Sequence, residues 1–303
     1  MPRGRLSIGV AVAGLLIVAA ACGASSARQS RSDRIQVVVA ESSWASIVAQ
    51  LGGDHVDVTT IVSSPDTDPH DYEPTPQDGR AIADAQYLVV NGLGYDSWAK
   101  KAADANPSSD RRVLDVGNLL GLHDGDNPHR WYFPADVHEV VQRITQDLRA
   151  IDPGADAYYE SQAQAFATTA LQQYTTLLSQ IRQRFAGTPV GASESIAVGL
   201  TDATGLRLVT PPAFLTAISE GGDPTAADKA TVDEQIAHGQ IAVLLFNSQN
   251  STPDVQALVD AARPNGVGVV AITETPPEDI TFQDWQSAQL QQLLDALARA
   301  TGK

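Results

Sequence analysis

The chain carries the same local pattern twice, in which short runs of β-branched and other apolar residues alternate with helix-like segments. In the first half these runs are 36–40 (QVVVA), 58–62 (VTTIV), 87–91 (YLVVN) and 112–116 (RVLDV). In the second half they are 189–193 (PVGAS), 206–210 (LRLVT), 241–246 (IAVLLF) and 266–272 (GVGVVAI). Apolar strands that alternate with helices are typical of parallel sheets covered on both faces. The pattern predicts an α/β protein with two lobes, each a mostly parallel sheet flanked by helices.

Between the two halves lies a long amphipathic stretch, 155–185. Apolar side chains recur there at spacings of three and four, at Tyr159, Ala163, Phe166, Ala170, Tyr174, Leu178, Ile181 and Phe185. One helix of about 30 residues would be about 45 Å long at 1.5 Å per residue, and it would begin after the breaker 152–154 and end at Gly187. We therefore expect an N-terminal lobe at 35–152, one long rigid linking helix at 153–187 and a C-terminal lobe at 188–303.

The first residues have the features of an export signal. Arg3 and Arg5 precede an apolar or small run, 8–21, that is too short to span a bilayer and is typical of a signal peptide. It leads into Cys22, the only cysteine, and the sequence Ala-Ala-Cys-Gly resembles the lipobox of bacterial lipoproteins, with Ala19 where leucine is usual. We predict a lipoprotein signal peptide at 1–21, lipidation of Cys22 and a polar tether at 22–34, which would hold the protein on the extracytoplasmic face of the cell membrane. The alternative is plain secretion with a free thiol.

Charge limits the partners. The chain has 20 Lys and Arg against 36 Asp and Glu, a formal charge of −16, which repels phosphate backbones and argues against nucleic acid as a partner. An acidic surface also concentrates cations, although it is more often a solubility feature.

Two of the six histidines stand in loops of one design. His70 lies in the segment 68–74 (Asp-Pro-His-Asp-Tyr-Glu-Pro), after a predicted strand and before a helix that Thr75 should cap. His129 lies in the segment 127–131 (Asn-Pro-His-Arg-Trp), before a helix predicted over 135–151. A preceding proline stiffens each loop, and imidazole is the commonest ligand for transition metals, so the pair predicts part of a preformed metal site.

Two carboxylates in the second half complete a candidate set. Glu194 and Glu274 each follow a predicted strand, where the carboxyl ends of parallel strands open onto a cleft. With His70 and His129 they would give a divalent ion two nitrogens from one lobe and two carboxylates from the other. Asp279 and Asp284 compete for the role given to Glu274. His55, His138 and His238 are interpreted as structural or exposed residues, and His123 as part of a surface loop.

These segments resemble the metal-binding class of ABC-transporter substrate-binding proteins, the zinc- and manganese-binding lipoproteins. The segments 68–76 and 127–131 resemble the first two ligand motifs of that family, and the resemblance implies the third and fourth ligands at Glu194 and Glu274. Three departures are visible: Glu274 stands where Asp is usual, the family's Trp-Leu-Asp-Pro reads Trp-Tyr-Phe-Pro at 131–134, and the His-rich loop of many zinc importers is absent. The resemblance also implies limited rocking of the lobes about a stiff helix.

The combined prediction is a lipid-anchored receptor, not an enzyme, that binds one Zn²⁺ or Mn²⁺ ion as cargo and delivers it to an ABC import permease driven by a separate ATPase. We expect a monomer. Two other classes stay open at this point. A zinc-dependent hydrolase would need an open coordination position and a general base, and a lipid-anchored adhesin or scaffold would leave the His and Glu residues without a role.

Overall fold

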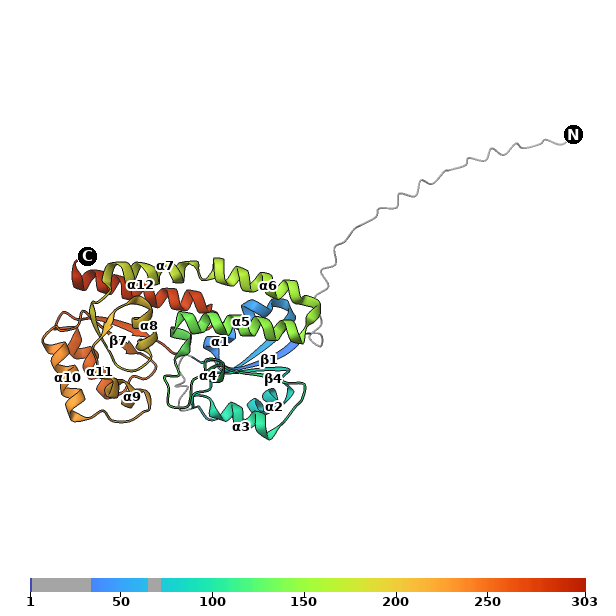
Figure 1. The fold of residues 1–303 in the computed structure, drawn as a ribbon, viewed down its shortest axis with the longest axis horizontal. Helices are drawn as coiled ribbons and strands as arrows, with labels where there is room; N and C mark the ends of the chain where they lie inside the picture. Colours follow the sequence, from blue (N-terminus) through green and yellow to red (C-terminus); the bar gives the residue numbers. More distant parts are fainter. Residues whose placement is uncertain (2–33, 65–71) are drawn as a thin grey trace.

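The computed structural model describes residues 34–64 and 72–303, besides Met1, and within them the chain forms two four-stranded parallel sheets (Figure 1). The first has the order β2-β1-β3-β4 and the second the order β6-β5-β7-β8. The strands are β1 (Ile35–Glu41), β2 (Val56–Val62), β3 (Tyr87–Val90), β4 (Arg112–Asp115), β5 (Pro189–Ala192), β6 (Arg207–Leu208), β7 (Val243–Asn247) and β8 (Gly268–Ile272). The predicted two-lobed α/β architecture is confirmed.

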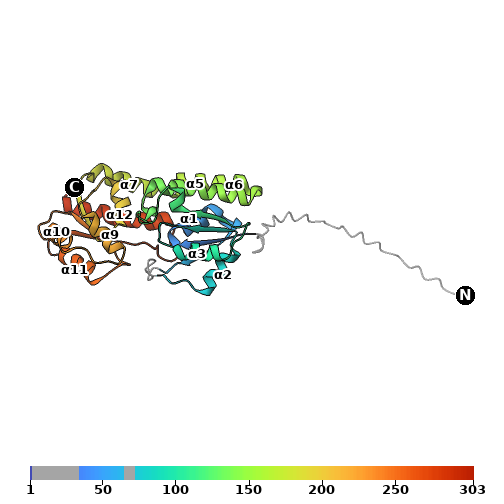
Figure 2. The same cartoon turned by 60° about the horizontal axis from the view of Figure 1, so that its bottom comes forward.

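Helices cover both faces of each sheet (Figures 1 and 2). In the first lobe, α1 (Ser42–Gly52) and α5 (Pro134–Ile151) pack on one face, and α2 (Pro76–Asp84) and α3 (Ser97–Ala105) pack on the other. The remaining helices of the two lobes are α4 (Val116–Leu119), α8 (Ala197–Thr204), α9 (Pro212–Ser219), α10 (Ala226–Ala237) and α11 (Pro253–Ala262), with short helical turns at Gly53–His55, Arg130–Tyr132 and Pro153–Ala155.

The start of α2 illustrates how local sequence sets an element. Thr75 caps the helix, because its side chain accepts a hydrogen bond from the Asp78 backbone N–H, and the Asp78 carboxylate in turn accepts one from the Thr75 N–H. Pro76 occupies the first turn, where a missing N–H costs nothing. The cap predicted at Thr75 is confirmed.

The long connection between the lobes is helical, as predicted, but its hydrogen bonding changes partway. It consists of α6 (Asp156–Ala165), a π-helical turn at Phe166–Ala170 and α7 (Gln172–Phe185). At the junction the Leu171 N–H donates to the Phe166 carbonyl, five residues back, at 3.0 Å. The single regular α-helix that the sequence predicts is therefore interrupted by one turn that contains an extra residue.

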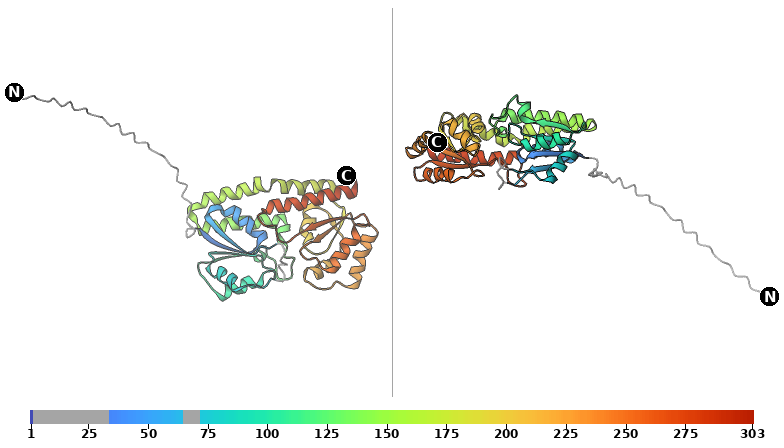
Figure 3. Two further views of the ribbon diagram at one scale, coloured as in Figure 1. Left: turned by 180° about the vertical axis from the view of Figure 1, so that it is seen from behind. Right: turned by 90° about the horizontal axis from the view of Figure 1, so that it is seen from below.

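A second helix also bridges the lobes, and the sequence pattern did not indicate it. The C-terminal helix α12 (Phe282–Thr301) runs beside α7 along the top of the molecule in Figure 1 and in the left view of Figure 3. At its first turn, the Phe282 N–H donates to Ser46 Oγ of α1 at 2.9 Å. One continuous apolar core lies beneath α1, α5, α7 and α12 and extends through both lobes, so the two sheets are joined along this side.

The predicted signal peptide, Cys22 and His70 lie outside the described residues. Over the part of the chain that is described, no helix combines the length and the apolar character needed to cross a membrane.

Candidate metal centre

Three of the four predicted metal ligands meet in the space between the lobes. Among the described residues, His129, Glu194 and Glu274 each place a ligand atom within 4.8 Å of the others. All three side chains are almost completely buried, with 0–2% of each residue exposed. They come from three places: His129 precedes the turn at Arg130–Tyr132, Glu194 follows β5, and Glu274 follows β8. The arrangement is therefore tertiary, and only the folded chain creates it.

Neighbours fix the imidazole of His129. Its Nδ1 lies 3.0 Å from Asn127 Oδ1 and 3.4 Å from Ser195 Oγ, while its ring packs edge-on against Trp131 at 5.6 Å between centroids. Nε2 points toward Glu274, 3.5 Å from Oε2. A proton on Nδ1 can be donated to Asn127, which leaves the lone pair of Nε2 directed at the carboxylates. This is the tautomer that a metal-binding histidine requires.

Amide side chains orient the two carboxylates. Asn247 donates to Glu194 Oε1 at 2.5 Å and to Glu274 Oε1 at 2.6 Å, and Asn250 donates to Glu194 Oε2 at 3.0 Å. The hydroxyl of Tyr95 donates to Glu274 Oε2. Gln249 Oε1 accepts hydrogen bonds from the backbone N–H groups of Glu274 and Thr275 at 2.6 and 2.9 Å, which holds the chain after β8. The carboxylate oxygens are thus fixed before any ion binds.

The electrostatics of the centre favour a cation. Burial, and next the carboxyl of Glu274, raise the pKa of Glu194 to about 7, while His129, Asn247 and Asn250 act in the opposite direction. Glu41 ends β1 nearby, and burial together with Asp96 and Glu274 raises its pKa well above its ordinary value. Buried carboxylates that repel one another are costly unless a positive charge compensates them. A divalent ion between the carboxylates would supply that compensation.

The two competitors of Glu274 lie outside this cluster. Asp279 is exposed in a loop, with a positive φ of 59°. Asp284 is exposed in the first turn of α12, where its carboxylate accepts from Thr281 Oγ1 at 2.7 Å and its N–H donates back at 3.3 Å. Asp284 thus has a helix-capping role.

The other histidines lie away from the centre. His55 Nδ1 is 3.1 Å from Asp152 Oδ2 in the turn before β2. His123 and His138 are exposed, and His238 ends α10 before Gly239. These positions agree with the structural or exposed roles that the sequence predicted.

Sequence reasoning missed the polar residues that hold the centre together: Tyr95, Asn127, Asn247, Gln249 and Asn250. One signal was available, because Asn247 directly follows an apolar run and so stands at the same sheet edge as Glu194 and Glu274. Tyr95 gives no comparable signal, since it follows a Gly-Leu-Gly turn in which Leu93 has a φ of 60°.

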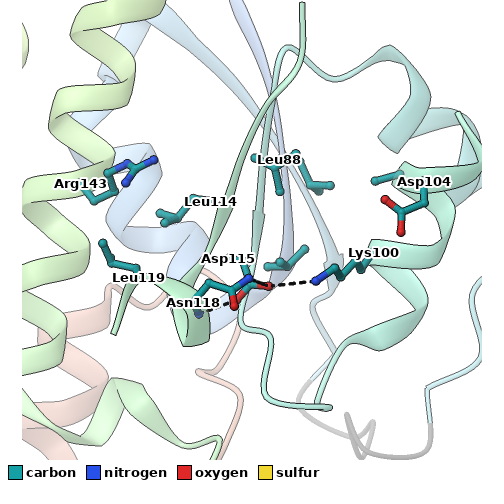
Figure 4. Close-up of a pocket in the computed structure, with 11 residues that line it drawn as sticks. Leu88, Lys100, Asp104, Leu114, Asp115, Asn118, Leu119 and Arg143 are labelled. Carbon is teal, nitrogen blue, oxygen red and sulfur yellow. Dashed lines mark hydrogen bonds and ion pairs between the residues drawn. The ribbon is translucent and has the colours of Figure 1, made fainter. Parts of the chain in front are cut away.

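The first lobe also contains large cavities away from the metal centre. One of about 440 Å³ lies between α3, β4 and α4 and is lined by Leu88, Leu114 and Leu119 with charged side chains at its rim (Figure 4). These charges have partners, because Lys100 lies 3.7 Å from Asp115 and Arg143 lies 2.9 Å from Asp147. This cavity contains none of the three clustered side chains, so size alone does not identify the centre.

Known proteins share both the sequence and the fold. Over 158 residues the chain is 30% identical to the manganese-binding lipoprotein MntA of Halalkalibacterium halodurans, covering 50% of this chain and 52% of that protein. Over 176 residues it is 26% identical to the high-affinity zinc uptake system protein ZnuA of Bacillus subtilis, covering 51% and 55%. The chain thus spans about half the length of the curated relatives it matches.

A solved structure of a Mn-bound mutant of a periplasmic metal binding protein from Candidatus Liberibacter asiaticus has the same fold, with a TM-score of 0.73 at 20% identity over 87% of this chain and 99% of that one. Residues 37–296 match the family described as the zinc-uptake complex component A, periplasmic. That match extends over both lobes, from β1 into α12. The chain therefore belongs to the family of the periplasmic component A of zinc-uptake complexes.

Proposed function

We propose that this protein binds one divalent transition-metal ion, Zn²⁺ or Mn²⁺, between its lobes and passes it on as cargo. The observation that carries the proposal is the cluster of His129, Glu194 and Glu274, three buried donors that separate elements bring within 4.8 Å. Burying two ionised carboxylates beside each other destabilises the fold unless a proton or a bound cation compensates their charge. An imidazole nitrogen with two carboxylates suits both Zn²⁺ and Mn²⁺.

His70 is proposed as the fourth ligand. The segment that contains it follows β2 and precedes α2. β2 pairs in parallel with β1, and Val62 at the end of β2 lies opposite Glu41, so the chain leaves β2 at the carboxyl ends of the strands. Four ligands from the two lobes would close the coordination shell of the ion. A zinc hydrolase instead keeps one position open for water, so the complete set favours binding over catalysis.

Transport is supported by the relatives. The family is named for a component of an uptake complex, and the curated relatives are named as a manganese-binding lipoprotein and a zinc uptake protein. We therefore propose delivery to an ABC import permease with a separate ATPase, by a monomer held outside the cytoplasm through a lipid on Cys22. The chain acts as a binding protein and not as an enzyme.

The choice of metal depends on how the carboxylates bind. Single oxygens from Glu194 and Glu274 with two imidazoles give a tetrahedron that suits Zn²⁺, whereas two oxygens from each give the six-coordinate shell that Mn²⁺ accepts. Asn247 and Asn250 each donate a hydrogen bond to one oxygen of Glu194. Each oxygen keeps a second lone pair for a metal ion, so both binding modes are compatible with these amides.

Elemental analysis and titration test the proposal. The chain is purified without chelator, its metal content is measured, and the metal-free protein is titrated with Zn²⁺ and Mn²⁺ in competition. We expect one ion per chain and its loss in His129→Ala, with His138→Ala, an exposed histidine, as the matched control. Absence of stoichiometric metal in the wild-type protein would refute the proposal and leave the adhesin or scaffold class.

A further inference from the structure

The donors of the metal centre are buried, so an ion needs a path to reach them. A smaller cavity of about 240 Å³ lies between the lobes and is lined from both sides, by the 93–95 and 125–128 segments of the first lobe and by Ser195 and the end of α9 in the second. We call it the access pocket. Its outer residues Gly94, Asp126 and Glu220 are exposed, whereas Tyr95 and Ser219 are buried. It therefore leads from solvent into the interior.

The inner end of the access pocket is lined by residues that contact the metal centre. Tyr95 donates to Glu274, and both Asn127 and Ser195 approach Nδ1 of His129, at 3.0 and 3.4 Å. Asn127 also donates to the Ser195 carbonyl across the lobes at 2.7 Å. One layer of polar side chains thus separates the pocket from the ligand atoms.

The charges that line the access pocket have one sign. The pocket is lined by the carboxyl groups of Asp126 and Glu220 and by no Lys or Arg side chain among the described residues, in contrast to the cavity of Figure 4, which includes Lys100 and Arg143. Glu220 caps the C-terminal end of α9, where the helix dipole adds partial negative charge. A narrow cleft with this potential attracts cations and raises their local concentration.

From the position and charge of this cavity, we propose that the access pocket is the path by which the metal ion enters and leaves the centre, and that Asp126 and Glu220 attract it. The inference rests on the proposed function, because a path has meaning only if the centre binds an ion. Asp126 and Glu220 act before binding: they line the outer, exposed part of the pocket and do not belong to the donor cluster.

Stopped-flow mixing with Zn²⁺ tests the path, with the total tryptophan fluorescence as the signal, to which Trp131 beside His129 contributes. In the variant Asp126→Asn with Glu220→Gln we expect the association rate to fall about tenfold at low ionic strength, and the difference to shrink to less than about twofold at about 0.5 M salt. Asparagine keeps an oxygen that can accept from the His123 N–H, as Asp126 does at 2.9 Å. The matched control is Asp233→Asn with Glu234→Gln, an equal change of charge on exposed residues of α10.

A second variant tests the path by bulk instead of charge. Thr216→Trp adds a large side chain at an exposed position in the wall of the pocket. If ions pass there, association and dissociation slow together by about the same factor and Kd is unchanged, because only the barrier is altered. Wild-type rates in both pocket variants, with metal still bound, would overturn the path alone. A wild-type protein that binds neither Zn²⁺ nor Mn²⁺ would overturn the proposed function and the path with it.

Discussion

The two lobes have the same strand order but use equivalent positions differently. The carboxyl ends of β1 and β5 occupy corresponding places in the orders β2-β1-β3-β4 and β6-β5-β7-β8. Each is followed or ended by a buried glutamate, Glu41 in the first lobe and Glu194 in the second. The neighbouring strands β3 and β7 also match, with Asn91 directly after one and Asn247 ending the other.

The partners of these residues show the difference. Asn247 donates to both carboxylates of the centre. Asn91 instead accepts from Trp44 Nε1 and donates to the carbonyl of Pro128, each at 3.0 Å. The second lobe thus presents the proposed metal ligands at its strand ends. The first lobe instead uses its strand ends to hold the loop that carries His129. Topology provides the place for a site, and side chains decide its use.

The largest expected effect is on the metal Kd, and it should differ between variants of the two glutamates. Glu194→Gln keeps the size of the side chain but removes the charge, so we expect the metal Kd to rise by about 10³-fold or more, which is about 4 kcal/mol. In Glu41→Gln we expect less than about a threefold change, because Glu41 lies outside the donor cluster and burial already favours its uncharged form. Competition titration measures both. Equal losses in the two variants would show that the lobes contribute alike.

The pH dependence of the metal-free protein is the next largest effect. Folded Glu194 keeps its proton up to a pKa of about 7, against 4.5 for the ordinary group. The folded state therefore binds more protons between these values, and its stability falls as the pH rises from about 4.5 through 7, by up to about 3 kcal/mol from this group.

Urea unfolding of metal-free wild type and Glu194→Gln at pH 5 and pH 8 measures this contribution. If the free energy of unfolding fell by the same amount between pH 5 and pH 8 in both proteins, the contribution assigned to Glu194 would be contradicted. Metal binding has the opposite trend, because the ion needs the ionised carboxylate and neutral imidazole, so affinity should rise over the same pH range.

Replacing the two asparagines should affect different properties, the stability of the fold for Asn91 and the metal affinity for Asn247. Asn91→Ala leaves the buried Trp44 N–H without its acceptor and removes one of the two hydrogen bonds to the Pro128 carbonyl, which keeps the Arg130 N–H. We therefore expect a loss of about 2 kcal/mol in the free energy of unfolding. Asn247→Ala removes the group that orients both carboxylates, and should weaken metal binding by about 10- to 100-fold. Thermal unfolding and titration of each variant measure the two effects. If only Asn91→Ala lost metal affinity, the structural role given to Asn91 and the carboxylate-orienting role given to Asn247 would both be wrong.

The smallest effect concerns the closeness of the lobes. A Cβ on Gly199 of α8 would lie 2.6 Å from Phe133 Cδ2 and 2.8 Å from the backbone carbon of Tyr132. Gly199→Ala should therefore push α8 from this segment and cost about 1–2 kcal/mol of stability. A weaker metal Kd should accompany the loss, because the segment begins one turn after His129. Unchanged unfolding and binding would mean that the contact adapts freely.

The sequence predicted the parts of the molecule that depend on local pattern. Strand positions follow from apolar runs, and the cap at Thr75 follows from one residue and its neighbours. Glu194 and Glu274 were predictable because strand ends in a parallel sheet meet at one edge. The contacts of Tyr95 and Asn127 were not predictable, since they join residues up to 179 positions apart and depend on how the lobes pack. The bridging role of α12 depends in the same way on tertiary contact with α1.

The most direct test of the proposed centre is anomalous diffraction from crystals of the protein loaded with Zn²⁺ or Mn²⁺, recorded at the absorption edge of the metal. We predict one strong peak between the lobes, about 2.0–2.2 Å from His129 Nε2 and from oxygens of Glu194 and Glu274, with His70 as the fourth protein ligand. A fully occupied peak elsewhere, for example in the exposed loop of His123 and Asp124, with none among the three buried side chains, would contradict it.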